Sequence, residues 1–170
     1  SYTATEHTTP NVVEVHRYLA SLRDQGAKLV MMEVSSHGLS HGRVDGVAFE
    51  GAVFTNLSRD HLDYHGSMEA YAQCKKTLFE VPSLQFAAIN RDDPYAGVMM
   101  DALSSDVALT TYGDNAEADV HTKQQTLNAN SITATIQVGD QEFEICSPLM
   151  GQFNLTNVLA VLAVAKAKND

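Results

Sequence analysis

Four short apolar runs in the first two thirds of the chain, separated by stretches with helical periodicity, limit the folds that this sequence can adopt. The runs occupy residues 29–34, 51–57, 86–89 and 107–112. Runs of this length and continuity are typical of parallel strands buried on both faces, and the helical stretches between them supply the crossover connections. The pattern predicts an α/β fold with a mostly parallel sheet flanked by helices.

The last third of the chain has a different pattern. Residues 120–127, 131–138 and 142–146 alternate polar and apolar side chains, and Gly139-Asp140 separates the last two segments. Such alternation indicates strands with one face in the core and the other in water, so we expect a small antiparallel β appendage. A final helix over 154–168, rich in Ala, Val and Leu, is expected to be largely buried.

Capping residues mark the expected ends of the other helices. Thr9 is expected to cap a first helix that begins at Pro10 and stops before Gly26. Ser67 is expected to cap a second helix that runs to about residue 81, and a third is expected over 94–103. No repeat or flexible linker interrupts the pattern, so we expect one domain.

Composition excludes several classes of protein. With 170 residues, 44% hydrophobic and 19% charged, the chain is long and apolar enough to bury a core. A formal net charge of −10 argues against a nucleic acid or an anionic membrane as partner. No membrane span or signal pattern is visible, and Cys74 and Cys146 match no zinc or redox spacing, as expected in a reducing cytoplasm. Because the first residue is Ser1 and not Met, we expect a piece of a longer chain.

Polar side chains gather after the first two apolar runs, where open α/β sheets place their sites. Glu33 ends the first run, and a carboxylate there needs a cation or a hydrogen-bond network because its desolvation is costly. An ion pair of Glu33 with Arg43 or Arg59 is the alternative. Ser35-Ser36-His37 lacks the G-x-S-x-G pattern of a serine hydrolase elbow.

The histidines and lysines allow both a structural and a functional interpretation. His37 and His41, like His61 and His65, have the four-residue spacing of a helical zinc site, but the surrounding Gly, Ser and Asp favour loops, where this spacing has no such geometry. On residue type alone, Lys75 and Lys76 are expected on the solvated face of an amphipathic helix.

Two longer strings stand out: EVSSHGL at 33–39, followed by Arg43, and TNLSRDHLDYHG at 55–66, followed by Lys75. They resemble the central domain of the Mur ligases, the ATP-dependent amide ligases of peptidoglycan synthesis. Thr8-Thr9-Pro10 and GQFNLTN at 151–157 agree in order, so the resemblance covers essentially the whole chain. EVSSHGL resembles the members that add the third amino acid of the stem peptide.

The resemblance implies a phosphate-loop-NTPase-like fold and a role for each matching residue. Glu33 and His61 match magnesium ligands, and Lys75 matches a lysine that the family carries as a carbamate, an oxygen ligand suited to Mg²⁺. The matching residues for the UDP-sugar dipeptide are Thr8, Thr9, Ser35, His41 and Arg43, and those for the nucleotide are Asn154 and Asn157. His41 stands where the family usually has glutamine, and Asn154 also suits an N-cap.

The implied reaction uses three substrates and takes place in the bacterial cytoplasm. ATP phosphorylates a carboxylate of UDP-MurNAc-L-Ala-D-Glu, and the amino group of a diamino acid attacks the acyl phosphate to form an amide, with Mg²⁺ as cofactor. We expect meso-diaminopimelate in preference to L-lysine. Neither nucleic acid nor membrane insertion is expected, and the oligomeric state stays open.

One part of the family pattern is missing from the 170 residues. No G-x-x-x-x-G-K-[ST] phosphate loop occurs, so the first strand with its loop is expected upstream of Ser1. The N-terminal UDP-binding domain and the C-terminal ligase domain are likewise expected outside, and the fragment alone is expected to be inactive. The alternatives are a non-catalytic substrate-binding module of the same fold and a metal-dependent hydrolase that rests on the histidines alone.

Overall fold

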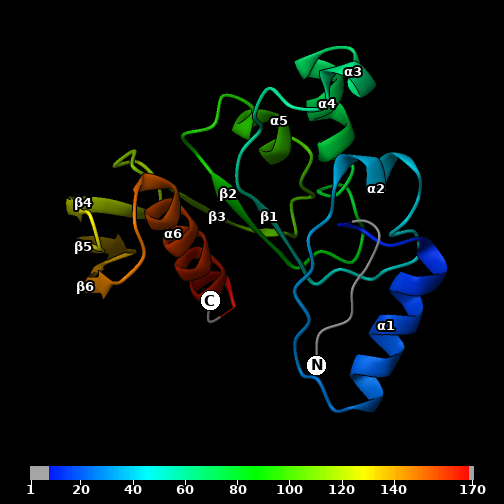
Figure 1. Cartoon of the computed structure of the whole chain (residues 1–170), viewed down its shortest axis with the longest axis horizontal. Helices are drawn as coiled ribbons and strands as arrows, with labels where there is room; N and C mark the ends of the chain where they lie inside the picture. The colour runs from blue at the N-terminus through cyan, green and yellow to red at the C-terminus, as the bar shows by residue number, and fades with distance from the viewer. Residues whose placement is uncertain (1–7, 169–170) are drawn as a thin grey trace.

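The computed structural model describes residues 8–168, which form one six-stranded sheet with helices on both faces (Figure 1). The strands are β1 (Gly51–Phe54), β2 (Phe86–Asn90), β3 (Ala108–Gly113), β4 (Val120–Asn128), β5 (Ser131–Val138) and β6 (Gln141–Ser147). The helices are α1 (Val12–Asp24), α2 (Ser36–Ser40), α3 (Leu62–His65), α4 (Met68–Lys76), α5 (Ala96–Met100) and α6 (Gln152–Ala167). No helix in this described range is long and apolar enough to cross a membrane.

The sheet follows chain order from β1 to β6 and changes character in the middle. β1 to β4 are parallel, with Phe54 opposite Ile89 at the last β1–β2 pair. β4, β5 and β6 form an antiparallel meander with a tight turn at Gly139-Asp140. Both halves of the predicted sheet, parallel first and antiparallel last, are therefore confirmed.

Each face of the sheet has its own core. On β2, Ala87 and Ile89 face α4 and α5, whereas Ala88 faces α6, as the two-residue period of a strand requires. The α4–α5 side also buries Phe54 and Phe79. On the other side, α6 packs its fully buried Leu155, Leu159 and Ala163 against β3, β4 and β5, which confirms the predicted buried helix.

Several predicted helix ends were wrong. The first helix is capped by Asn11, whose side chain accepts from the backbone N–H of Glu14, so Thr9 and Pro10 lie outside it. Gly26, at φ +83°, follows the helix as predicted. Ser67 caps α4 as predicted, but that helix ends at Lys76 rather than near residue 81. Residues 94–103 form only the five-residue α5.

The largest error concerns residues 29–34, which were predicted to form a buried parallel strand. They run extended between α1 and α2 without strand pairing, and Leu29 and Met31 are 59% and 83% exposed. An apolar run cannot form a strand without a neighbour to supply the ladder bonds. The nearest strand is β1, and a groove separates the two.

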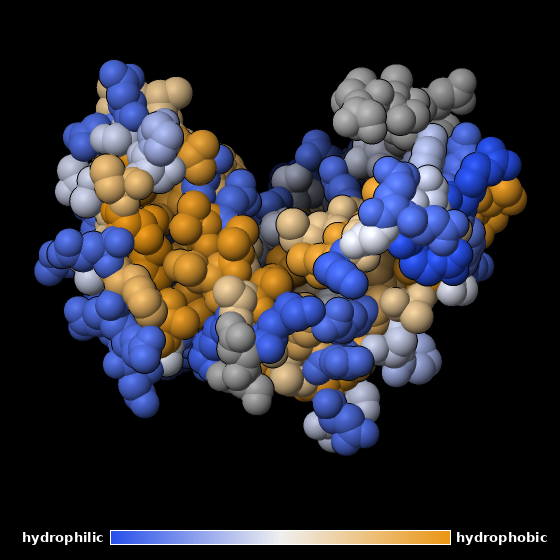
Figure 2. All heavy atoms as spheres, turned by 90° about the horizontal axis from the view of Figure 1, so that it is seen from below, coloured by the Kyte–Doolittle hydropathy of each residue, from blue (hydrophilic) through white to orange (hydrophobic). Residues whose placement is uncertain are grey.

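This groove, which we call the β1 groove, has a volume of about 720 Å³. Residues 28–34 line one side and 50–56 the other, with parts of α1 and α6 at its ends. Figure 2 shows hydrophobic residues gathered around the hollow between the two sides of the molecule. Within the described residues, β1 therefore pairs only with β2 and has an open edge toward the groove.

Candidate functional site

The candidate site lies where residues 33–37 and the end of β1 approach α4. Lys75 of α4 is half-buried, and its Nζ donates a hydrogen bond to the carbonyl oxygen of Val34 at 3.1 Å. Burial lowers the pKa of Lys75, and the nearby Glu33 carboxylate partly offsets this shift. The solvated position expected from residue type is therefore wrong for Lys75. Lys76 is also half-buried, and its Nζ forms an ion pair with Glu80 at 3.2 Å.

The Lys75 environment favours reactions of a neutral amine. A lowered pKa increases the fraction of the side chain that is uncharged near neutral pH, and only the uncharged amine can act as a nucleophile. Glu33 is exposed beside it, and among the described residues it forms no ion pair with Arg43 or Arg59. The alternative of a structural ion pair at Glu33 is thus not supported.

Thr9 organises the loop that carries Glu33. It is fully buried, its Oγ1 lies 3.2 Å from the carbonyl oxygen of Glu33, and it accepts from the backbone N–H of Ser35 at 3.0 Å. Ser35 in turn caps α2 by accepting from the N–H of Gly38. A Cβ at Gly38 would lie 2.8 Å from Thr9 Cγ2, so the close approach of α2 to Thr9 requires glycine.

The other residues predicted to contact substrate lie around this loop. Arg43 donates from Nη1 to the carbonyl oxygen of Thr9 at 2.9 Å, and one part of its guanidinium fork is thus held by the protein. Thr8 is exposed. His41 is exposed at the end of α2, and its Nδ1 lies 2.8 Å from the carbonyl oxygen of His37. Thr8, Thr9, Ser35, His41 and Arg43 are therefore brought to one region, although nothing in the structure tests their roles.

Two of the four histidines, His37 and His65, lie on short helices, so the expectation of loops was wrong for them, whereas His41 and His61 flank those helices. His37 belongs to α2 and His65 to α3, and their ring centroids are 5.8 Å apart. His65 stacks on Tyr71 at 4.7 Å, and His37 contacts His61 edge-on at 4.9 Å. Burial is the main cause that lowers the pKa of both His37 and His65. These contacts explain the histidines as a packed ring cluster.

His61 occupies the most constrained backbone position of the site. At φ +60° and ψ +21° it is left-handed, and it is the single such residue other than glycine in the described part of the chain. A side chain there is uncommon and tends to mark function, since the strain must be offset by surrounding contacts.

Asn154 and Asn157 lie on the first turns of α6, far along the chain from this cluster. Gly151, not Asn154, caps the helix, so the capping expectation was wrong. The Nδ2 atom of Asn154 donates to the carbonyl oxygen of Met150 at 2.7 Å, and Asn157 is exposed. The structure leaves the Asn157 side chain accessible, while that of Asn154 is half-buried.

Sequence reasoning missed residues that hold the site together. Ser36 is 1% exposed, its Oγ lies 2.9 Å from Nε2 of His65, and its carbonyl oxygen accepts from Cys74. Asn90, Asp93 and Tyr112 bind the backbone at the end of β1. The signal for two of them was present, because the polar string NRDD at 90–93 directly follows the apolar run at 86–89.

The described residues fit a magnesium site in part. No group of three His, Cys, Asp or Glu side chains among residues 8–168 converges to hold a metal ion. Glu33 offers a hard carboxylate oxygen, which Mg²⁺ prefers, but a Lys75 amine offers only hydrogen-bond donors. Lys75 fits the ion if it carries a carbamate, which replaces those donors with anionic oxygens.

Comparison with known proteins defines the class. The family model of the Mur ligase middle domain matches residues 1–165, and the chain therefore belongs to the Mur ligase family as its middle domain. This agrees with the fold and with the predicted family.

Relatives narrow the branch of the family. The chain is 46% identical over 168 residues to the UDP-N-acetylmuramoyl-L-alanyl-D-glutamate--2,6-diaminopimelate ligase of Xylella fastidiosa (strain 9a5c), covering 97% of this chain and 34% of that protein. It is 44% identical over 163 residues to the ligase of the same name from Neisseria meningitidis serogroup B (strain ATCC BAA-335 / MC58), covering 94% of this chain and 33% of that one. The chain thus spans about a third of these relatives.

Solved structures agree. A structure of a UDP-N-acetylmuramoyl-L-alanyl-D-glutamate--2,6-diaminopimelate ligase superposes with a TM-score of 0.89 at 36% identity, over 99% of this chain and 35% of that one. A MurF structure from Acinetobacter baumannii, at 20% identity and a TM-score of 0.65, covers 73% of this chain and 27% of that one, and it shares the fold.

Proposed function

We propose that this middle domain serves an ATP-dependent ligase that adds meso-diaminopimelate to UDP-MurNAc-L-Ala-D-Glu in the bacterial cytoplasm. The names of relatives at 44–46% identity, which are 2,6-diaminopimelate ligases, support this substrate pair. ATP transfers its γ-phosphoryl group to a substrate carboxylate, the amino group of the diamino acid attacks the acyl carbon, and phosphate leaves as the amide forms. The observation that carries the proposal is the half-buried Lys75 beside Glu33.

Lys75 is proposed to act as a carbamate. Its lowered pKa favours the neutral amine, which adds CO2 and releases a proton to form an N-carboxylate. The resulting anion would lie near the Glu33 carboxylate, and two neighbouring anions repel each other unless a cation lies between them. Glu33, His61 and the modified Lys75 are therefore proposed to hold magnesium, which supplies neutralisation of phosphate charge when bound.

Thr8, Thr9, Ser35, His41 and Arg43 are proposed to bind the peptide substrate. Arg43 supports this role because only Nη1 is used within the protein, which leaves other donors of its planar fork for a carboxylate or phosphate. Asn154 and Asn157 are proposed to lie near the nucleotide base. These roles come from the family pattern, and the described geometry supports them by leaving Arg43 and Asn157 partly or fully accessible.

A phosphate-binding segment from outside these 170 residues is proposed to complete the site. The β1 groove supports this, because a strand occupies about 160 Å³ per residue at a spacing of about 4.8 Å and a layer thickness of about 10 Å. A groove of about 720 Å³ then accommodates about four or five residues, which matches the four residues of β1. The proposed occupant is the strand that leads into the phosphate loop, and its insertion would give residues 29–34 a ladder partner.

Hydrogen exchange tests the occupant of the groove. In the 170-residue chain, the β1 amides that do not bond to β2 should exchange rapidly, and in the full-length gene product they should be protected. Protection that appears in the 170-residue chain and rises with its concentration would instead show that a second copy fills the groove. Equal and rapid exchange in both proteins would also contradict the proposal.

A ligase assay tests the function itself. The full-length gene product is incubated with UDP-MurNAc-L-Ala-D-Glu, Mg-ATP and either meso-diaminopimelate or L-lysine, and amide product and phosphate are measured. We expect product with meso-diaminopimelate. Preferred use of L-lysine would change the identity of the added amino acid and leave the proposed ligase reaction intact. Binding of the UDP substrate without turnover would favour the non-catalytic module.

A further inference from the structure

The loop from Thr55 to His61 leaves the sheet where strand pairing stops. The last β1–β2 pair joins Phe54 and Ile89, so the backbone groups that follow Phe54 need other partners. Three side chains, one each from β2, β3 and the turn after β2, supply them. Tyr112 Oη donates to the carbonyl oxygen of Phe54 at 2.9 Å, and Asn90 Nδ2 donates to that of Thr55 at 2.6 Å. The backbone N–H of Leu57 donates to Asp93 Oδ2 at 2.8 Å.

Each of these three side chains is itself held in one orientation. Asn90 is 7% exposed, and its Oδ1 accepts from the N–H of Asp92 at 3.1 Å. Asp93 accepts from the N–H of Tyr95 with its second oxygen at 2.8 Å. Tyr112 is fully buried, and burial, with a smaller effect of the Asp93 charge, raises the pKa of its hydroxyl. The hydroxyl therefore stays protonated and remains a donor.

The other end of the loop carries the strained residue. Ser58 and Asp60 form a local turn, in which Ser58 Oγ donates to Asp60 Oδ2 at 2.6 Å, and His61 follows at φ +60°. This bond is local and exposed, so it does not tie the loop to the sheet. A strained backbone persists only where surrounding structure holds it, so the anchorage at 54–57 bears on the position of His61.

We propose that Asn90, Asp93 and Tyr112 form a clamp that positions His61, with Asp93 as its principal positioning residue. Asp93 matters most because its two carboxylate oxygens accept from two backbone amides, of which one belongs to the loop and the other to the turn before α5. The inference rests on the proposed function, in which His61 belongs to the reaction site. None of the three side chains needs to touch a substrate for this role.

The test compares two isosteric variants in the full-length gene product. Asp93→Asn replaces one carboxylate oxygen with an NH2 group, and this donor then faces one of the two backbone N–H donors. Asp119→Asn makes the same change at a matched carboxylate, whose Oδ2 accepts at 2.7 Å from both the N–H and the Oγ1 of Thr111, away from the His61 loop. Both variants are expected to lose similar free energy of unfolding. Only Asp93→Asn is expected to lower kcat, by roughly ten-fold or more, since small displacements at a reaction site carry costs of this order.

Amide exchange provides a readout that does not depend on activity. Asp93→Asn should speed exchange of the Leu57 amide relative to Asp119→Asn. Tyr112→Phe removes a single hydroxyl and serves as a second, milder variant if Asp93→Asn does not fold, with a smaller fall in kcat expected. Equal kcat losses in the Asp93 and Asp119 variants, or an unchanged kcat despite faster exchange, would overturn the clamp. A wild-type protein without ligase activity would contradict the proposed function, while an unchanged Leu57 exchange rate would contradict the clamp separately.

Discussion

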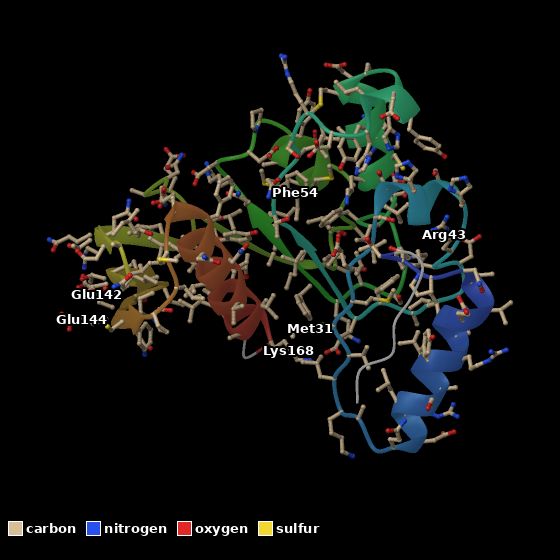
Figure 3. All side chains as sticks on the ribbon, viewed as in Figure 1. Met31, Arg43, Phe54, Glu142, Glu144 and Lys168 are labelled. Atoms are coloured by element: carbon tan, nitrogen blue, oxygen red, sulfur yellow. The ribbon has the colours of Figure 1, made fainter. Side chains whose placement is uncertain are left out.

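β6 closes one side of the sheet with Gln141, Glu142 and Glu144 exposed to water, whereas β1 at the other side borders an apolar groove. Figure 3 shows Glu142 and Glu144 at one end of the molecule, and Phe54 and Met31 near the middle, on the groove. Charged side chains on an edge strand oppose pairing with another strand. The charged β6 edge thus opposes pairing with a further strand, whereas the apolar β1 edge does not.

The two sides also differ in their residues: one holds an apolar core, and the other holds the candidate catalytic side chains. The β6 side, made of the meander and α6, has a complete apolar core and, among the described residues, none of the predicted catalytic groups. The β1 side holds Glu33, His61 and Lys75 near the open edge of the sheet. Open α/β folds bind ligands at the carboxyl ends of their strands, and the candidate site likewise lies near the carboxyl end of β1.

The largest expected effect distinguishes Lys75, on the β1 side of the molecule, from Lys123, on the β6 side. In the full-length gene product, Lys75→Ala should lower ligase activity by roughly 10²–10³-fold, because it removes the proposed carbamate from the reaction site. Added short carboxylates should restore part of the rate by occupying its place. Lys123→Ala on β4 removes an exposed ion pair with Glu142 and should leave the rate unchanged. Full activity of Lys75→Ala would return Lys75 to a structural role.

A second pair of variants compares the edges directly. Val53 on β1 and Phe143 on β6 are similarly exposed in the described structure, at 41% and 44%. Val53→Asp should destabilise the full-length protein by about 2 kcal/mol more than Phe143→Asp, since only the Val53 position becomes covered. Chemical denaturation measures both changes. Equal losses would contradict the assignment of β1 as the covered edge.

A smaller effect is expected on substrate binding. Arg43→Lys keeps the charge but loses the planar fork, so KM for the UDP-dipeptide should rise by about ten-fold while KM for ATP changes little. Steady-state kinetics with each substrate varied in turn measures the two constants. A parallel rise of both would place Arg43 outside the peptide side of the site.

The smallest effect is a pH dependence of stability. Burial lowers the pKa of His37 and His65, so the unfolded chain binds protons more readily than the folded one. Stability is therefore complete above the ordinary histidine pKa of about 6.5 and falls as the pH drops below it. Urea unfolding at about pH 7.5 and about pH 5 should show this loss, and His65→Phe should reduce it. A pH dependence unchanged by His65→Phe would assign the loss to other groups.

Much of this contrast was predictable from sequence, and the failures at residues 29–34 and at the clamp share one cause. The meander and α6 were predicted well because their partners are adjacent in the chain and their periodicity is clear. Residues 29–34 have the composition of a buried strand, but composition cannot supply a neighbouring strand. The site residues were found mainly by family resemblance, because periodicity shows which face a residue occupies and not which loops meet. The clamp of Asn90, Asp93 and Tyr112 depends on contacts between distant segments, which no local pattern encodes.

Calorimetry with Mg-ATP tests most directly the central claim that the β1 side lacks its phosphate-binding segment. The backbone amides and lysine of a phosphate loop supply most of the affinity for a nucleotide in such folds. We therefore predict that the 170-residue chain binds Mg-ATP with a Kd no tighter than about 1 mM, or about −4 kcal/mol, and that the full-length gene product binds in the micromolar range. Micromolar binding by the 170-residue chain alone would contradict the account, because the phosphate site would then lie within it.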